Sequence, residues 1–103
     1  MRIWLDDIRE MPDGYDIWCK TAIDAMGLIT KGYVKFISFD HDLGEDLLNG
    51  YDVAITIELF AHYKLIDPIE WDVHSANPVG RRQIELTMIQ AEKFWREKDG
   101  QLS

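Results

Sequence analysis

The sequence has 103 residues, 47% of them hydrophobic, which is enough for one small core and predicts a single domain over residues 1–103. Its formal net charge of −8 argues against binding to long nucleic acids or anionic membranes, because both attract basic surfaces. A small anion in a locally positive pocket is still compatible with this charge.

Seven segments have the apolar spacing of a strand or a helix. In chain order, they are strands at residues 2–5 and 16–20, a helix at 21–31, a strand at 35–39, a helix at 51–65, a strand at 71–74 and a helix from 78 to about 98. Thr21 and Asn77 are predicted to cap the first and third helices, and Pro78 suits the first turn of the third.

This alternation predicts an α/β fold with about four mostly parallel strands and helices on both faces, which makes three layers. The segment between the first two strands is too short for an ordinary crossover helix. Either a loop or a single turn makes that crossover, or the two strands pair differently.

Polar side chains gather directly after three of the predicted strands. The three clusters are Asp6, Asp7 and Arg9; Asp40, His41 and Asp42; and His74, Ser75 and Asn77. Ligands of open parallel sheets bind beyond the carboxyl ends of the strands, so the clusters predict a ligand site at that edge.

The carboxylates of Asp6, Asp7, Asp40 and Asp42 would repel one another at this edge. Mg²⁺ or Mn²⁺, which prefer oxygen ligands, would relieve the repulsion. The alternative is that arginine side chains and capping amides neutralise these charges.

His41 and His74 each follow a strand and could serve as general base and general acid on a phosphodiester. The alternative for each is a structural histidine that is hydrogen-bonded to a loop.

A phosphate site is predicted where the third helix begins. Helix N-termini attract anions, Gly80 would allow close approach to the backbone, and Arg81 could clamp a phosphate. Ser75, Asn77 and Arg9 complete the predicted phosphate-binding set. The alternative is an ordinary cap followed by solvated arginines.

The single cysteine, Cys19, lies in an apolar run and is predicted to be buried and inert. With no internal disulfide and no signal peptide ahead of the first strand, the expected location is the cytoplasm.

Four motifs together resemble the cyclic-phosphate processing receiver domain family. They are Leu-Asp-Asp-Ile-Arg at 5–9, Ser-Phe-Asp-His-Asp-Leu-Gly at 38–44, Gly-Tyr-Asp-Val-Ala at 50–54 and His-Ser-Ala-Asn-Pro-Val-Gly at 74–80. The resemblance implies a receiver-like, flavodoxin-type fold whose altered active site handles cyclic phosphates on nucleotides or RNA ends.

Signalling receivers carry an acidic pair, a phosphoaccepting aspartate, a serine or threonine, and a lysine after successive strands. Asp6-Asp7, Asp40 and Ser75 match the first three positions. No fifth strand precedes the last predicted helix to carry the lysine, and this disfavours a phosphorelay switch.

The leading hypothesis is therefore a metal-assisted cyclic phosphodiesterase, with His41 and His74 as acid and base. Asp40, with Asp6 or Asp7, would hold a cation or orient the histidines. One alternative is a module that binds a cyclic nucleotide without turnover, and another is a degenerate receiver used for protein interaction.

Overall fold

A four-stranded sheet and three helices make up the computed structural model, which describes residues 1–97. In chain order the elements are β1 (Arg2–Leu5), β2 (Ile17–Cys19), α1 (Ala22–Thr30), β3 (Phe36–Phe39), α2 (Gly50–His62), β4 (Glu70–Val73) and α3 (Pro78–Arg96). All seven predicted elements are present, and the predicted end of the last helix near residue 98 lies outside the described residues.

The strands lie in the order β2-β1-β3-β4, and every neighbouring pair is parallel. Ile3 pairs with Ile17 and with Ile37, so β1 lies inside the sheet. The crossover from β1 to β2 is a loop over residues 6–16 that contains no helix. The first of the two alternatives left by the sequence is therefore the correct one.

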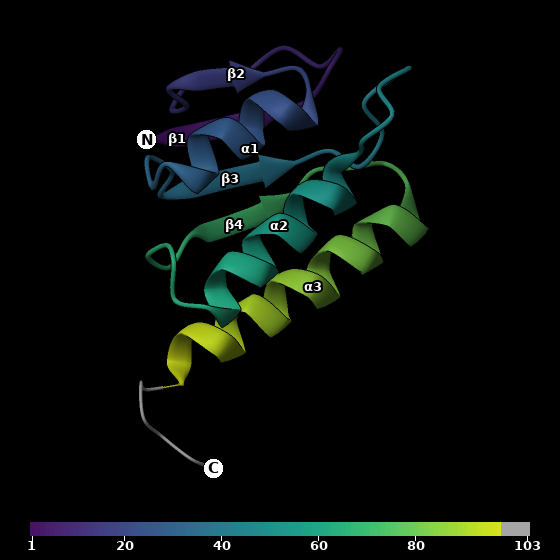
Figure 1. Ribbon diagram of the computed structural model, residues 1–103. Helices are drawn as coiled ribbons and strands as arrows, with labels where there is room; N and C mark the ends of the chain where they lie inside the picture. Colours follow the sequence, from purple (N-terminus) through teal and green to yellow (C-terminus); the bar gives the residue numbers. More distant parts are fainter. Residues whose placement is uncertain (98–103) are drawn as a thin grey trace.

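All three helices cover the same face of the sheet (Figure 1). Crossovers between parallel strands are right-handed, and the connections from β2 to β3 and from β3 to β4 cross the sheet in the same direction. Their helices therefore lie on one side, and α3 packs beside α2. The α/β class and the parallel sheet are confirmed, whereas the predicted second helical layer is absent from residues 1–97.

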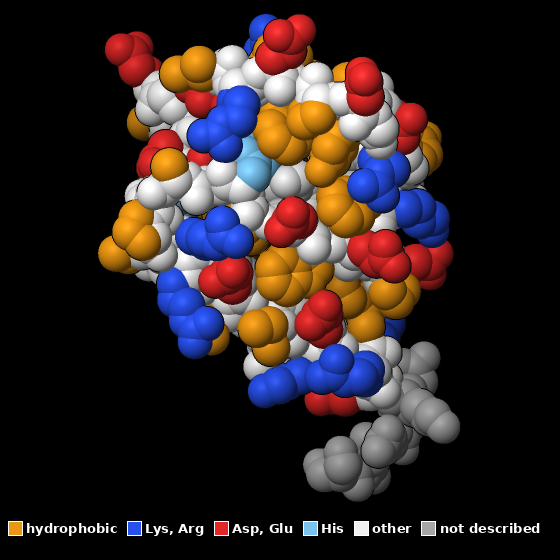
Figure 2. All heavy atoms as spheres, turned by 180° about the vertical axis from the view of Figure 1, so that it is seen from behind, with side chains coloured by type: hydrophobic (Ala, Val, Ile, Leu, Met, Phe, Trp, Pro, Cys, Tyr) orange, Lys and Arg blue, Asp and Glu red, His pale blue; other side chains and the backbone are white. Residues whose placement is uncertain are grey.

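The two faces of the sheet differ in what covers them. Ile3, Leu5 and Phe39 are fully buried in the core beneath the helices. Figure 2 shows the molecule from the side opposite to that of Figure 1. On the sheet face away from the helices, Trp4 contacts Tyr15 of the 6–16 loop at a ring distance of 5.2 Å. Trp4 is only 6% exposed, so the loop substitutes for part of the missing helical layer.

Side-chain caps fix where each helix begins. Thr21 accepts a hydrogen bond from the Asp24 amide at 3.2 Å, and Asn77 accepts one from the Gly80 amide at 3.0 Å, as predicted. Asn49 and Asp52 form a reciprocal capping box that starts α2 one residue before the predicted position. None of the helices in the described part of the chain is both long and apolar enough to cross a membrane.

At Gly50 the start of α2 lies directly against the chain that follows β3. Its amide donates to the His41 carbonyl oxygen at 2.9 Å, and a Cβ at this position would overlap the carbonyl oxygen of Asp40. This contact sets the position of the strand-end loop that carries Asp40.

We predict that Gly50→Ala lowers the free energy of unfolding by about 1–3 kcal/mol, because the backbone around Asp40 must shift to admit the methyl group. Gly27→Ala is the matched control: Gly27 lies inside α1 with open space around it, so a gain of up to about 1 kcal/mol is expected. Urea denaturation measures both, and equal effects would contradict the close approach at Gly50.

Candidate functional site

A cavity of about 360 Å³ opens at the carboxyl edge of the sheet, where the sequence predicted a ligand site. Its walls come from the loops after β1 and β3. The lining residues are Asp6, Asp7, Ile8, Arg9, Asp40, Asp42 and Gly44. Four acidic residues and one arginine therefore line a single space.

Three of these carboxylates form a compact group. Asp6, Asp7 and Asp40 each offer an oxygen atom, and the three atoms lie within 4.8 Å of one another. Such an all-oxygen set matches the preference of Mg²⁺ and Mn²⁺. Asp42 lines the cavity with a side chain that is 65% exposed, but it is not part of this group.

Asp6 is the buried member of the group, with 2% of its surface exposed. Its Oδ1 accepts hydrogen bonds from the amides of Ile8 at 2.9 Å and Arg9 at 2.7 Å, and its Oδ2 accepts one from His74 Nε2 at 3.0 Å. Burial alone would raise the pKa of Asp6, but these hydrogen bonds outweigh it and lower the pKa. Asp6 is therefore a carboxylate at neutral pH.

Asp40 lies in a less favourable environment. Burial, and then the negative charge of Asp6, raise its pKa, although hydrogen bonds from Ser75 and the His41 amide partly offset them. The His41 amide donates to Oδ1 of Asp40 at 2.8 Å. Asp40 is thus the carboxylate that gains most from a nearby positive charge or a proton.

His74 is enclosed behind the cavity and does not line it. Its Nε2 donates to Asp6, its Nδ1 lies 2.7 Å from Ser38 Oγ, and its ring stacks on Trp4 with the centroids 3.7 Å apart. Burial lowers the pKa of His74 despite the neighbouring carboxylates, which favours the neutral ring. The contacts with Asp6 and Ser38 occupy both ring nitrogens of His74.

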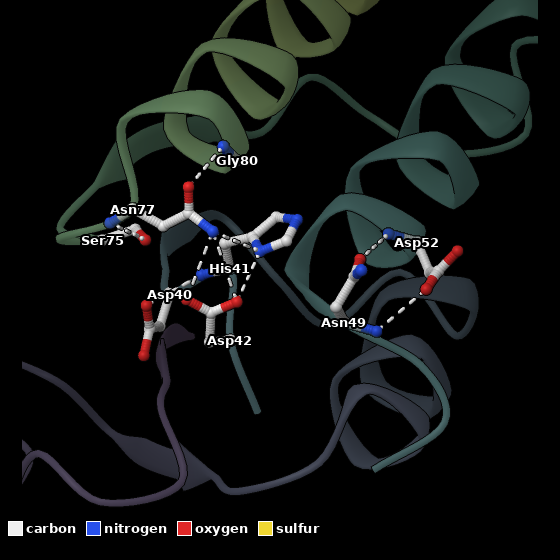
Figure 3. A network of polar contacts seen from close by, with 8 residues as sticks. All are labelled: Asp40, His41, Asp42, Asn49, Asp52, Ser75, Asn77 and Gly80. Atoms are coloured by element: carbon white, nitrogen blue, oxygen red, sulfur yellow. Dashed lines mark hydrogen bonds and ion pairs between the residues drawn. The ribbon is translucent and has the colours of Figure 1, made fainter. Parts of the chain in front are cut away.

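His41 belongs to a separate network (Figure 3). Its Nδ1 lies 2.9 Å from Asp42 Oδ1 and 3.5 Å from Asn77 Nδ2, and its ring rests against Gly80 at the start of α3. The ring of His41 and the carboxylate of Asp40 point in different directions in Figure 3. The structure therefore does not bring His41 and His74 together at the cavity.

The start of α3 is filled by the protein itself. The ring of His41 occupies the space over Gly80 that the sequence analysis assigned to a phosphate. The side-chain oxygen of Asn77 accepts a hydrogen bond from the Gly80 amide, and its backbone oxygen accepts one from the Arg81 amide. Ser75 Oγ accepts a hydrogen bond from the Asn77 amide. Gly80 thus admits a histidine ring, and Asn77 engages the amides of Gly80 and Arg81. Phosphate binding at this helix N-terminus stays a prediction.

The two predicted phosphate-binding arginines have different positions. Arg9 lines the cavity, and its Nη1 donates to the carbonyl oxygen of His74 at 2.9 Å. Arg81 instead pairs along α3 with Glu85, at an Nε–Oε2 distance of 3.4 Å, and does not line the cavity. Arg9 is thus the cation placed to meet an anion there.

Ser38 and the indoles of Trp4 and Trp18, which support the loop of Asp6, were not among the residues predicted for the site. Trp18 Nε1 donates to the backbone oxygen of Asp6 at 2.7 Å, and Trp4 Nε1 donates to that of Arg9 at 2.8 Å. Ser38 is 1% exposed within an otherwise apolar strand. A polar residue there needs a buried partner, and this was the available signal.

A family model described as Cyclic-phosphate processing Receiver domain matches residues 1–90, which include all four motifs noted in the sequence. No curated protein and no solved structure matches the chain.

Asp40→Asn is expected to stabilise the cation-free protein at neutral pH. The raised pKa means that ionised Asp40 opposes folding, and asparagine removes that charge but keeps an oxygen for the His41 amide. The gain should exceed the roughly 0.5 kcal/mol typical of surface changes. It should shrink as the pH falls through the raised pKa, because native Asp40 is then protonated.

Denaturation in EDTA across the acid to neutral range measures this effect. Asp13→Asn is the control, since it removes an exposed carboxylate in a turn away from the cavity. A neutral-pH stability of Asp40→Asn at or below that of the wild-type protein would contradict the assigned electrostatics.

Proposed function

Since the chain belongs to the family of cyclic-phosphate processing receiver domains, we propose that it opens the cyclic phosphate of a nucleotide or RNA end with the help of a divalent cation. The observation that carries the proposal is the convergence of Asp6, Asp7 and Asp40, with Arg9 in the wall of the same cavity. The net charge of −8 favours a short ligand over a long polynucleotide.

Asp6, Asp7 and Asp40 would hold Mg²⁺ or Mn²⁺. When bound, such a cation acidifies water and offsets charge on a phosphoryl group. The oxygen ligands that the chain supplies differ in pKa. The pKa of Asp6 is lowered, which keeps it ionised, whereas the pKa of Asp40 is raised, which makes it the more basic carboxylate.

The proposed reaction is hydrolysis of one ring P–O bond. A water oxygen attacks phosphorus as Asp40 takes a proton from that water. The ring P–O bond then breaks, and Asp40 returns the proton to the departing sugar oxygen, so that a phosphomonoester with a free hydroxyl results. Arg9, which is anchored to the His74 carbonyl, would stabilise charge on the phosphoryl oxygens.

A second candidate is a module that binds a cyclic nucleotide without turning it over. One observation favours it: neither His41 nor His74 lines the cavity, so no imidazole is positioned there as acid or base. Asp40 would then serve only as an oxygen ligand.

³¹P NMR of a panel of 2′,3′-cyclic nucleotides, 3′,5′-cyclic nucleotides and cyclic dinucleotides tests both candidates. With Mg²⁺ or Mn²⁺ we expect new monoester signals for at least one substrate, and none with EDTA. Asp7→Asn should abolish them, because it removes one of the three negative charges that would hold the cation, whereas Asp13→Asn should leave turnover unchanged.

Chemically unchanged ligands would reject the hydrolase for this panel. Shifted or broadened signals of an unchanged ligand would then support the binding module. Turnover that persists in Asp7→Asn or in EDTA would remove the cation from the proposal.

A further inference from the structure

A chain of hydrogen bonds links three neighbouring strands behind the acidic cavity. Ser38 lies in β3, His74 directly follows β4, and Asp6 directly follows β1. Ser38 Oγ and His74 Nδ1 are 2.7 Å apart, and His74 Nε2 and Asp6 Oδ2 are 3.0 Å apart. The first and last members, Ser38 and Asp6, are 1% and 2% exposed.

We propose that this Ser38–His74–Asp6 relay orients Asp6 as a cation ligand, with His74 acting as a positioning residue and not as the acid or base of the reaction. The hydrogen-bonded relay stands on its own geometry, and its cation role rests on the proposed function.

The position of each proton follows from the partners. Ionised Asp6 can only accept a hydrogen bond, so the hydrogen lies on Nε2 of His74. In the neutral ring Nδ1 is then an acceptor, and the Ser38 hydroxyl donates to it. Ser38 thereby selects the tautomer that points an N–H group at Asp6.

Further contacts keep the His74 ring in this orientation. The ring stacks on Trp4 with an interplanar angle of 4°. Arg9 donates to the His74 carbonyl, and Trp4 Nε1 donates to the Arg9 carbonyl, so the loop that carries Asp6 and the end of β4 are tied together. Trp4 and Ser38 belong to the sheet face opposite the helices.

The relay leaves Asp6 preorganised for a cation. Two amides occupy Oδ1, and His74 occupies one position on Oδ2. A carboxylate offers about four acceptor positions, so roughly one lone pair of Asp6 remains free. This lone pair is available to a cation held together with Asp7 and Asp40. Outer hydrogen bonds of this kind orient metal ligands and typically change cation affinity by about 10–100-fold.

The first test observes the His74 ring directly, in the full chain without a cation. Long-range ¹H–¹⁵N correlation spectra should show a proton on Nε2 and a lone pair on Nδ1. Ser38→Ala should shift His74 toward a mixture of tautomers. A wild-type ring that carries its proton on Nδ1, or a Ser38→Ala spectrum identical to that of the wild type, would overturn the relay.

The second test titrates each protein with MnCl₂ and follows free Mn²⁺ by electron paramagnetic resonance. Ser38→Ala should weaken Mn²⁺ binding by about 10-fold or more. His74→Gln, whose amide nitrogen can still donate to Asp6, should retain more affinity than His74→Leu. Thr30→Ala, which removes an exposed hydroxyl at the end of α1, is the control and should match the wild type.

The outcomes separate this inference from the proposed function. Wild-type affinity in Ser38→Ala, or equal losses in His74→Gln and His74→Leu, would overturn the relay while leaving the cation site in place. A wild-type protein that binds no Mn²⁺ would overturn both the proposed cation chemistry and the relay's part in it.

Discussion

The ionised carboxylate of Asp6, almost fully buried at the end of β1, is the constraint on which the site depends. A buried charge is costly unless hydrogen bonds compensate it. Two loop amides and the ring of His74 provide this compensation, and they fix the loop after β1 and the end of β4 relative to each other. Asp40 lies beside that charge, and burial followed by the charge of Asp6 raises the pKa of Asp40.

The absence of a helix between β1 and β2 gives the site its particular form. The 6–16 loop supplies the amides that bind Asp6, the guanidinium of Arg9 in the cavity wall, and Tyr15 against Trp4. An ordinary crossover helix would occupy the face where His74 now stacks on Trp4. The absence of this helix therefore leaves the space in which His74 packs behind the acidic group.

Two glycines hold the remaining strand-end loop in place. Gly50 brings α2 against the backbone of Asp40, and Gly80 accepts the ring of His41 at the start of α3. The polar residues that line the cavity are Arg9 and the four aspartates Asp6, Asp7, Asp40 and Asp42. The protein is acidic overall, and the residues that line its cavity are mostly acidic as well.

The sequence by itself determined the order of the seven elements, the caps at Thr21 and Asn77, the carboxyl edge of the sheet as the place of the site, and the family. These features depend on local spacing and on motifs a few residues long. The tertiary structure decided that the helices share one face, that Asp6, Asp7 and Asp40 converge while Asp42 stands apart, and that His41 and His74 lie in separate networks. Strand order and handedness are properties of the whole sheet, and the direction of His74 is set by Asp6, 68 residues away in the chain. Partners at such separation meet only when the sheet has formed, and no local pattern specifies them.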